Sequence, residues 1–260
     1  MSSKIGCALV TGASSGIGED FARELAARGY DLILSARRRD RLEALKEELT
    51  ASFPIKIEVL VADLSEPTGA QQLFDQIELL SSPVKLLVNN AGLGLFGAFK
   101  SQSLLDLQSM IQVNLTSLTT LTRLFADQMS RAGGGYILNV ASFSAIQPTP
   151  DYAVYSGTKA FVLAFSQALN HGLYQRKVRV CALCPGFFES EFFAGSGQRP
   201  SFIVKMIMLN RRSVARAGIV GVLRGRTLVV PGVFYKCLNL MLRFTPRSLA
   251  TALADFGVKH

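Results

Sequence analysis

The sequence predicts one α/β domain in which helices cover both faces of a doubly wound, parallel sheet of seven strands. Short apolar segments alternate with segments of helical periodicity over most of the 260 residues. This alternation is typical of parallel strands joined by helical crossovers. A glycine-rich turn joins the first apolar segment to the first helical one. The length suits a single domain with a large core.

Hydrophobic patterns assign the individual elements. Runs rich in Val, Ile and Leu, bounded by Gly, Asn or Asp, predict strands at residues 5–10, 31–35, 56–61, 85–89, 135–140, 178–184 and 226–230. The segments with helical periodicity predict helices at residues 18–28, 39–52, 68–80, 104–131 and 152–174. Continuous apolar strands of this kind are buried on both faces, which agrees with a parallel sheet.

Residues 187–225 interrupt the alternation before the last strand. They combine several phenylalanines and glycines with an apolar patch at residues 202–209. We predict a helical substrate lid inserted into the single domain of residues 1–260. The alternative is an ordinary pair of surface helices.

The net charge of +9 is concentrated in the last quarter of the chain. Residues 1–198 have a net charge of −1, whereas residues 199–260 contain 11 Lys and Arg and a single acidic residue. No nucleic-acid-binding motif accompanies this charge, so nucleic acid is not an expected partner. Residues 231–260 also place apolar side chains at helical spacing. This basic amphipathic segment would suit a membrane surface or an acidic acyl-carrier protein, and a solvated face or an oligomer contact is the alternative.

The cysteines and the N-terminus indicate a cytoplasmic protein. Cys181 and Cys184 are three positions apart on a predicted strand, so their side chains point to opposite faces and suit neither a disulfide nor a shared metal. The first strand begins so early that no room is left for a signal peptide. No apolar run reaches the ~20 residues of a membrane span. His171 and His260 do not form a metal-binding set.

The turn after the first strand predicts a dinucleotide site. It reads Thr11-Gly12-Ala13-Ser14-Ser15-Gly16-Ile17-Gly18 and leads directly into a helix. Glycines permit a tight turn and let backbone N–H groups approach a pyrophosphate, which also faces the positive end of the helix dipole. The position between a first strand and a helix makes the pattern more specific than the glycines alone.

The end of the second strand indicates which dinucleotide binds. An NAD-preferring site would place Asp or Glu near Ala36, where a carboxylate accepts hydrogen bonds from the ribose 2′-hydroxyl. Here Ala36 leaves space, and Arg37 and Arg38 follow it. A guanidinium pairs well with a 2′-phosphate, so we expect NADP(H). One of the two arginines could instead be a solvated charge at the start of the next helix.

Across residues 4–232 the chain resembles the compact short-chain dehydrogenase/reductase family, whose members have a Rossmann fold. The resemblance rests on motifs in the family's order and spacing: Thr11-Gly-x3-Gly16-x-Gly18, Asp63, Asn89-Asn90-Ala91-Gly92, Asn114, Ser142, Tyr155-x3-Lys159 and Pro185-Gly186. It implies an NADP-dependent oxidoreductase. The chain is most similar to the branch that reduces 3-oxoacyl, ketosteroid or related lipid carbonyls.

Tyr155 and Lys159 are the expected acid–base pair. They are one helical turn apart, so both side chains project from the same face. A free tyrosine titrates near about 10, and a nearby ammonium favours the phenolate, which brings the acid closer to working pH. In reduction, Tyr155 would donate its proton to the substrate oxygen as hydride reaches the carbon.

The resemblance implies roles for the other motif residues. Ser142 would hold the substrate oxygen, Asn114 would hold a water that relays protons to Lys159, and Asp63 would bind the adenine. Taken singly, these three could equally be a turn residue, a buried amide and a helix cap. The expected catalytic residues are Asn114, Ser142, Tyr155 and Lys159. The expected cofactor-binding residues are Gly12, Ser14, Ser15, Gly16, Ile17, Gly18, Arg37, Arg38, Asp63, Leu64, Asn90, Ala91, Gly92, Tyr155, Lys159, Pro185, Gly186 and Ser190.

Together, these observations predict an NADPH-dependent enzyme that reduces a ketone to a secondary alcohol, or catalyses the reverse reaction. The aromatic insertion and the basic amphipathic end favour a hydrophobic or 3-oxoacyl substrate. A reductase of small xenobiotic or sugar-like carbonyls is the alternative within the same class. A non-catalytic cofactor-sensing protein is an alternative from another class, although such a protein has no need of the complete Ser142, Tyr155 and Lys159 set.

The resemblance also implies self-association. Helices 104–131 and 152–174 would pair with those of a second copy to form a homodimer or homotetramer, because homo-oligomers usually close with two-fold symmetry. Phe161, Val162 and Phe165 would then be covered by the partner. The alternative is that they pack inside the monomer.

Overall fold

The seven-stranded sheet follows the predicted doubly wound order. The computed structural model describes residues 5–80, 83–188, 206–246, 248–252 and 254. The strands are β1 (Cys7–Thr11), β2 (Asp31–Ala36), β3 (Ile57–Val61), β4 (Val84–Asn89), β5 (Gly135–Val140), β6 (Val178–Leu183) and β7 (Leu228–Val229). All neighbours pair in parallel, in the order β3-β2-β1-β4-β5-β6-β7. The order therefore reverses between β1 and β4.

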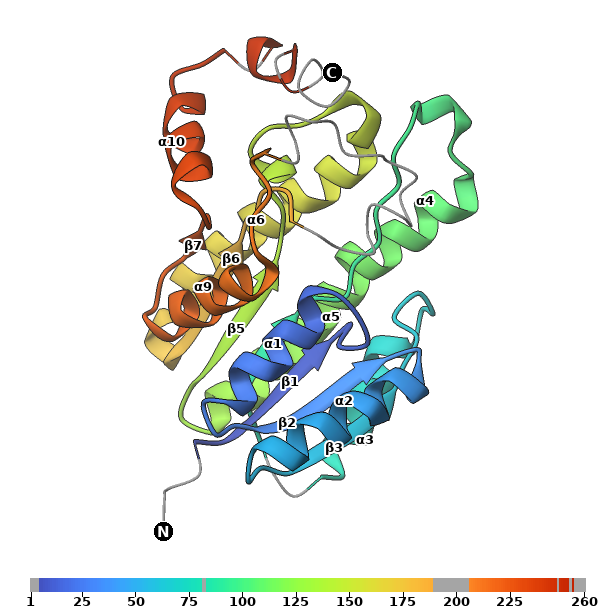
Figure 1. Cartoon of the computed structure of the whole chain (residues 1–260), viewed down its shortest axis with the longest axis vertical. Helices are drawn as coiled ribbons and strands as arrows, with labels where there is room; N and C mark the ends of the chain where they lie inside the picture. Colours follow the sequence, from blue (N-terminus) through green and yellow to red (C-terminus); the bar gives the residue numbers. More distant parts are fainter. Residues whose placement is uncertain (1–4, 81–82, 189–205, 247, 253, 255–260) are drawn as a thin grey trace.

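Helices cover both faces of this sheet (Figure 1). They are α1 (Ile17–Ala26), α2 (Arg39–Ser52), α3 (Gly69–Glu78), α4 (Leu104–Ile111), α5 (Leu118–Arg131), α6 (Ala153–Leu173), α9 (Arg211–Leu223) and α10 (Val233–Leu242). Apolar residues of α1, α2 and α9 form one core cluster with the sheet. Those of α3 and α5, with the end of α6, form the cluster on the other face. The predicted fold class is confirmed.

Buried polar side chains tie the centre of the sheet to the helices. Asn89 at the end of β4 donates from Nδ2 to Thr122 Oγ1 and to Asn139 Oδ1, both at 2.9 Å. Asn139 on β5 donates in turn to Ser166 Oγ on α6 at 2.9 Å. All four side chains are buried. Because such groups are costly to bury without partners, this network specifies how α5 and α6 sit on the sheet.

Two elements differ from their predicted bounds. The helix expected at 104–131 contains a π-helical segment, Gln112–Ser117, between α4 and α5. Hydrophobic periodicity does not distinguish a single widened turn from a regular one. The last strand shortens from 226–230 to Leu228–Val229, because it pairs only with β6 at the sheet edge and Pro231 soon follows. Short 3₁₀ helices lie at Phe99–Ser101, Phe143–Ala145, Pro150–Tyr152 and Tyr174–Arg176.

The predicted lid range, 187–225, includes a helix that belongs to the fold itself. Helix α9 packs against α1, and its Val214, Ile219 and Val222 are fully buried in the core. A helix with this buried face cannot act as a lid, so the predicted lid range of 187–225 is too long. Residues 189–205, on which the lid prediction now depends, lie outside the described residues.

The charge and the apolar pattern of the C-terminal quarter also separate in space. Five of its cations, Arg211, Arg212, Arg216, Arg224 and Arg226, lie on α9 or directly after it. Arg211 Nε lies 3.2 Å from the buried carboxylate of Asp20, at the first turn of α1. Five of the 11 cations of residues 199–260 therefore lie at α9, whereas residues 231–260, which include α10 and its apolar residues, contain four. The predicted basic amphipathic segment, residues 231–260, thus accounts for only part of the basic excess, and its role stays a prediction.

Only part of the predicted oligomer contact is accessible on the surface of the monomer. Val162 is completely buried inside the monomer, whereas Phe161 is 42% exposed and stacks on Phe165 with ring centroids 5.4 Å apart. Only the two phenylalanines thus remain available to a partner copy. Association as a dimer or tetramer stays a prediction.

Helix α10 is attached to the sheet through Tyr235. This side chain is 2% exposed, its hydroxyl accepts the N–H of Phe187 at 3.0 Å, and its ring packs edge-on against Phe143. A Cβ at Gly186 would overlap the Tyr235 ring, so only glycine allows this approach. Tyr235 therefore joins the segments that follow β5 and β6 to the C-terminal helix.

Tyr235→Phe tests this attachment. The change removes the acceptor of the Phe187 N–H while keeping the ring, so we expect the free energy of unfolding to fall by about 1–3 kcal/mol. Urea denaturation measures the difference. Tyr174→Phe is the matched control, because Tyr174 is 56% exposed. Equal stability of the Tyr235→Phe variant and the unmodified protein would contradict the attachment.

Candidate active site

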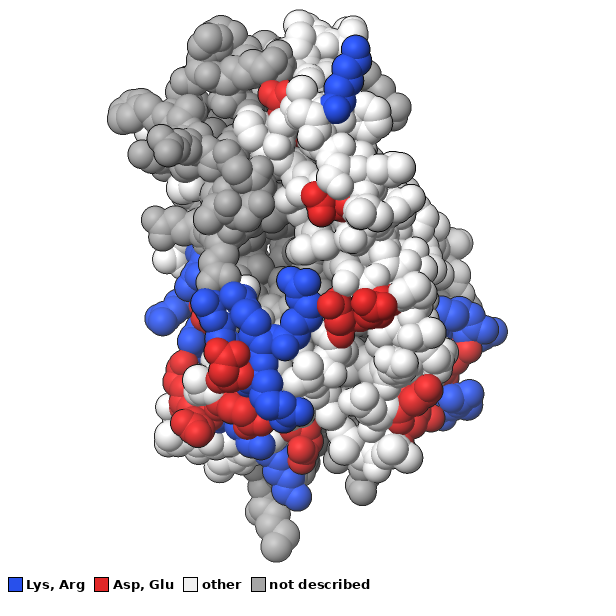
Figure 2. Space-filling view, turned by 90° about the vertical axis from the view of Figure 1, so that its right-hand side faces the viewer, with Lys and Arg blue, Asp and Glu red and all other residues white. Residues whose placement is uncertain are grey.

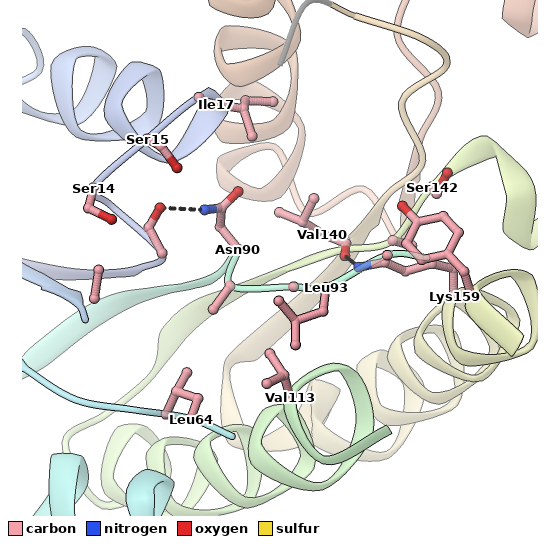
Figure 3. A pocket seen from close by; sticks show the side chains of 18 of the residues that line it. Ser14, Ser15, Ile17, Leu64, Asn90, Leu93, Val113, Val140, Ser142 and Lys159 are labelled. Atoms are coloured by element: carbon pink, nitrogen blue, oxygen red, sulfur yellow. Dashed lines mark hydrogen bonds between the residues drawn. The ribbon is translucent and has the colours of Figure 1, made fainter. Parts of the chain in front are cut away.

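A cleft of about 630 Å³ opens at the carboxyl ends of the strands. Its wall includes the turns after β1 and β4, where the strand order reverses, which is the place where open α/β sheets bind ligands. Ser14 and Ser15 stand at one end, Ser142 and Lys159 at the other, with Asn90 between them (Figure 3). The cleft therefore extends from the glycine turn to the expected acid–base pair.

The glycine turn after β1 fits a dinucleotide pyrophosphate. Gly12 and Gly16 have φ angles of +66° and +58°, which side chains rarely adopt. A Cβ on Gly12 would lie 2.9 Å from Ala91 Cα, whereas one on Gly16 would meet nothing within 4 Å. Gly16 therefore leaves open space at the N-terminus of α1, where backbone N–H groups favour an anion. A Cβ on Gly18 would overlap Gly12 O, so this glycine permits helix packing and does not line the cleft.

Asn90 holds the glycine turn against the end of β4. Its Nδ2 donates to Thr11 O at 2.9 Å and to Gly12 O at 3.2 Å. Thr11 Oγ1 accepts the N–H groups of Asn90 and Ala91, both at 3.1 Å. These bonds join two turns almost 80 residues apart in the sequence. Asn90, Ala91 and Gly92 line the cleft as expected.

Two arginines and one carboxylate lie at the end of the cleft formed by β2 and β3. Arg38 donates to Ser14 O at 3.2 Å, which places its guanidinium across the glycine turn. Arg37 is exposed and also lines the cleft. Burial alone would raise the pKa of Asp63, but hydrogen bonds from the Ser65 hydroxyl and N–H, with the charge of Arg37, hold that pKa below its usual value. Asp63 is thus a carboxylate near neutral pH.

Lys159 is a buried cation at the other end. It is 4% exposed, and its Nζ donates to Val140 O, the last carbonyl of β5, at 2.8 Å (Figure 3). The same Nζ lies 5.7 Å from the centre of the Tyr155 ring. Ser142, two residues beyond Val140, forms a hydrogen bond with Tyr155. The end of β5 and helix α6 therefore bring Ser142, Tyr155 and Lys159 together.

Burial determines the pKa values of this pair. It lowers the pKa of Lys159 to about 8 and raises the pKa of Tyr155, with the Ser142 hydrogen bond acting in the opposite direction on Tyr155. The prediction that Lys159 brings the Tyr155 pKa toward neutrality is therefore wrong for this structure. Desolvation is the largest influence on the Tyr155 pKa, while Lys159 Nζ donates to Val140 O and lies 5.7 Å from the centre of the Tyr155 ring. Tyr155 is protonated at neutral pH and can act as an acid.

Asn114 lies behind the wall of the cleft. The π-helical segment Gln112–Ser117 carries it, and its Oδ1 accepts the N–H of Leu93 at 2.9 Å while Nδ2 donates to Leu93 O at 2.8 Å. A Cβ on Gly92 would lie 3.3 Å from Asn114 Oδ1 and 3.4 Å from Lys159 Nζ. Asn114 and Lys159 thus approach the same glycine from two helices. The proton relay between them stays a prediction.

The wall beside Tyr155 includes residues outside the predicted site set, of which only Phe187 and Phe188 fall in the predicted lid range. They come from four separate segments and are mostly apolar: Leu93, Leu95, Val113, Tyr152, Phe187 and Phe188, with Asp106 and Ser109 as polar members. Tyr152 packs against Tyr155 with ring centroids 5.6 Å apart. In the sequence, only the spacing of three residues between Tyr152 and Tyr155 could have indicated this contact. Tyr235 was also missed, because its contact with Gly186 joins distant parts of the chain.

Most of the predicted site residues line the cleft. Those on its wall are Gly12, Ser14, Ser15, Gly16, Ile17, Arg37, Arg38, Asp63, Leu64, Asn90, Ala91, Gly92, Ser142, Tyr155, Lys159, Pro185 and Gly186. Gly18 and Asn114 support the wall from behind. Ser190 lies outside the described residues. Among the described residues, no group of three or more His, Cys, Asp or Glu could hold a metal ion.

Comparisons with known sequences identify relatives of the whole chain. A family model described as short chain dehydrogenase matches residues 6–200. An uncharacterized oxidoreductase of Mycobacterium tuberculosis is 31% identical over 243 residues, which cover 92% of this chain and 94% of the relative. A sulfoacetaldehyde reductase of Chromohalobacter salexigens is 37% identical over 188 residues, which cover 72% of this chain and 74% of the relative.

Solved structures agree with these sequence relatives. A short-chain dehydrogenase from Sphingobium yanoikuyae, in complex with NADPH, has a TM-score of 0.82 at 30% identity, covering 92% of this chain and 94% of its own. An alcohol dehydrogenase from Comamonas testosteroni that is specific for bulky-bulky ketones has a TM-score of 0.80 at 28% identity, covering 93% and 92%. With the family's motifs placed in order around one cleft, this chain belongs to the short-chain dehydrogenase family and is an oxidoreductase that uses a nicotinamide cofactor.

Proposed function

We propose that this oxidoreductase is an NADPH-dependent reductase of hydrophobic ketones. The observation that carries the proposal is the cleft itself, which has arginines at one end and a tyrosine acid within an apolar wall at the other. The first end determines which cofactor binds, and the second determines which substrate reacts.

The arginine end supports a preference for the 2′-phosphate. Arg37 and Arg38 line the cleft directly after Ala36, whose methyl group leaves the space that an acidic side chain would fill in an NAD-preferring site. Planar guanidinium groups pair with phosphate oxygens through two parallel hydrogen bonds. The structure with NADPH at 30% identity is consistent with this preference.

The acid end supports proton donation to a carbonyl oxygen. The cofactor supplies the hydride that reaches the carbonyl carbon. Tyr155, protonated because it is buried, donates its hydroxyl proton to the oxygen, which leaves a neutral alcohol. Ser142, hydrogen-bonded to Tyr155, holds the same oxygen. Lys159 stabilises the resulting tyrosinate by its positive charge and returns a proton to it, and in the oxidative direction the same groups act in reverse.

The wall beside Tyr155 supports a hydrophobic substrate. Leu93, Leu95, Val113, Phe187 and Phe188 contribute apolar surface, which suits a lipid-type ketone such as a ketosteroid or the chain of a 3-oxoacyl thioester. The specificity of the Comamonas enzyme for bulky-bulky ketones agrees with a large substrate. A preference for bulky apolar ketones over small ones in a substrate panel with NADPH tests this part of the proposal.

A small polar carbonyl is the second candidate. The sulfoacetaldehyde reductase among the relatives, together with Asp106 and Ser109 on the wall, favours it. However, a sulfonate or another anionic group needs a cation, and among the described lining residues the cations are Arg37, Arg38 and Lys159. Of these three cations, only Lys159 lies beside the apolar wall. Its ammonium already donates a hydrogen bond to Val140 O. The hydrophobic ketone therefore fits better.

Tyr155→Phe tests the chemistry. The variant loses the proton donor but keeps the ring, so turnover of the best ketone in the panel should fall by about 10²-fold or more. NADPH affinity, measured by fluorescence titration, should stay within a factor of about three and serves as the control for an intact fold. Turnover close to that of the unmodified protein would remove Tyr155 from the mechanism.

The double change Arg37→Ala/Arg38→Ala tests the cofactor preference. Charged hydrogen bonds contribute about 1.5–3 kcal/mol each, so NADPH binding should weaken by more than about tenfold, and by much more than NADH binding. Arg39→Ala is the matched control, because Arg39 begins α2, pairs with Glu43 and does not line the cleft. If the unmodified protein binds NADH as tightly as NADPH, the preference is wrong.

A further inference from the structure

Large exposed apolar side chains gather at the end of the molecule where the cleft opens. One group follows β4 and includes Phe99, Leu104 and Leu105, which are 60%, 69% and 74% exposed. The other lies on α10 and the turn after it, and includes Met241 and Phe244 at 64% and 84%. Both groups follow the carboxyl ends of parallel strands, and in Figure 1 α4 and α10 lie on opposite sides of the same end of the molecule. Asp106 and Ser109 of α4 line the cleft at this end. An apolar surface of this kind marks an interaction site.

Helix α10 is apolar on two opposite faces. Its inner residues Tyr235, Leu238 and Leu242 pack into a core cluster with the ends of β5 and β6. The outer face is formed by exposed side chains at helical spacing, namely Val233, Phe234, Leu240, Met241 and Phe244. A surface helix normally presents polar residues to solvent. The outer face of α10 therefore suits an apolar environment outside the monomer.

The charges beside the α10 group are positive, whereas the group after β4 has both signs, because the exposed Asp106 follows Leu105. Lys236 and Arg243 are exposed on α10 and next to it, and Lys100 is exposed beside Phe99. Within 231–254, the residues that the structure describes include no carboxylate. On the side of the molecule that carries α4, the described residues in the upper half of Figure 2 include few charges, whereas the lower half has many of both signs. Apolar side chains bordered by Lys and Arg are the chemistry of a surface that lies on anionic lipid.

We propose that the outer face of α10, together with Phe99, Leu104 and Leu105, docks this enzyme on the surface of an anionic lipid bilayer. In the described residues no helix is long and apolar enough to cross a membrane, so the contact is with the surface. A second copy of the chain fits less well, because a two-fold contact through α10 would bring Lys236 and Arg243 close to their own equivalents. An acidic carrier protein fits less well because exposed apolar side chains on α10 outnumber its cations.

Docking at this end would place the cleft near the lipid. Asp106 and Ser109 of α4 line one side of the cleft, and Phe187, which is held by Tyr235 of α10, lines the other. The two apolar groups therefore lie on the elements that border the opening. A hydrophobic ketone dissolved in the bilayer would reach the cleft without crossing much water. This last step rests on the proposed function, whereas the docking itself does not.

Co-sedimentation of the full chain with vesicles tests the docking. We compare phosphatidylcholine vesicles with vesicles that also contain phosphatidylglycerol, at low and high salt. The protein should bind the anionic vesicles, and high salt should weaken the binding because exposed charges are screened. Met241→Ser/Phe244→Ser and Lys236→Glu/Arg243→Glu should each lower the binding constant by about tenfold or more.

Matched controls come from the opposite end of the fold. Ile5→Ser/Leu79→Ser changes apolar side chains that are 53% and 86% exposed away from the cleft. Lys56→Glu/Arg176→Glu reverses exposed charges just before β3 and β6. Both controls should bind vesicles like the unmodified protein. The vesicle assay does not measure turnover. The docking proposal can therefore be wrong while the proposed reductase function is right, and the function can be wrong while the docking proposal is right.

Four outcomes would overturn the proposal. They are no binding to anionic vesicles at low salt, equal binding to neutral vesicles, equal losses in the control variants, and a dimer in sedimentation velocity that Met241→Ser/Phe244→Ser converts to a monomer. The last would assign the surface to a second copy. Retention by an acyl-carrier protein without vesicle binding would likewise replace the bilayer by that protein.

Discussion

The buried ammonium of Lys159 is the group around which the site is arranged. Taking a cation out of water is costly, and the hydrogen bond to Val140 O at 2.8 Å offsets part of that cost. This bond requires the last carbonyl of β5 to face α6, which also places Ser142 and Tyr155 beside each other. Gly92 lies close to both Asn114 and this ammonium, because a Cβ at position 92 would lie 3.3 Å from Asn114 Oδ1 and 3.4 Å from Lys159 Nζ.

The rest of the fold can be understood as support for this arrangement. The buried network of Asn89, Asn139 and Ser166 connects β4, β5 and α6, so the helix that carries Tyr155 and Lys159 has one position on the sheet. Tyr235 on α10 holds the segment after β6 in place, since it packs on Gly186 and accepts the N–H of Phe187. Helix α10 thus touches the active-site wall with one face while its other face is exposed.

The sequence predicted those parts of the site that depend on local pattern. The glycine turn, Arg37 and Arg38, and the Tyr155 and Lys159 spacing are short motifs, and the strands follow from continuous apolar runs. It did not predict the π-helical turn at Asn114, the core position of α9 or the role of Tyr235. Each of these depends on contacts between distant segments. The Tyr155 pKa was misjudged for the same reason, because burial is a property of the whole fold.

The pH dependence of stability tests the buried ammonium most directly. Burial lowers the pKa of Lys159 to about 8, below its usual value of 10.5. Between these values the unfolded chain holds a proton that the folded chain has lost, so the free energy of unfolding should rise with pH. In the absence of cofactor, the difference between the unmodified protein and Lys159→Met should therefore shift by up to about 3 kcal/mol in favour of the unmodified protein from pH 7.5 to 10. Parallel stability curves for the two proteins would contradict a buried ammonium at the centre of the site.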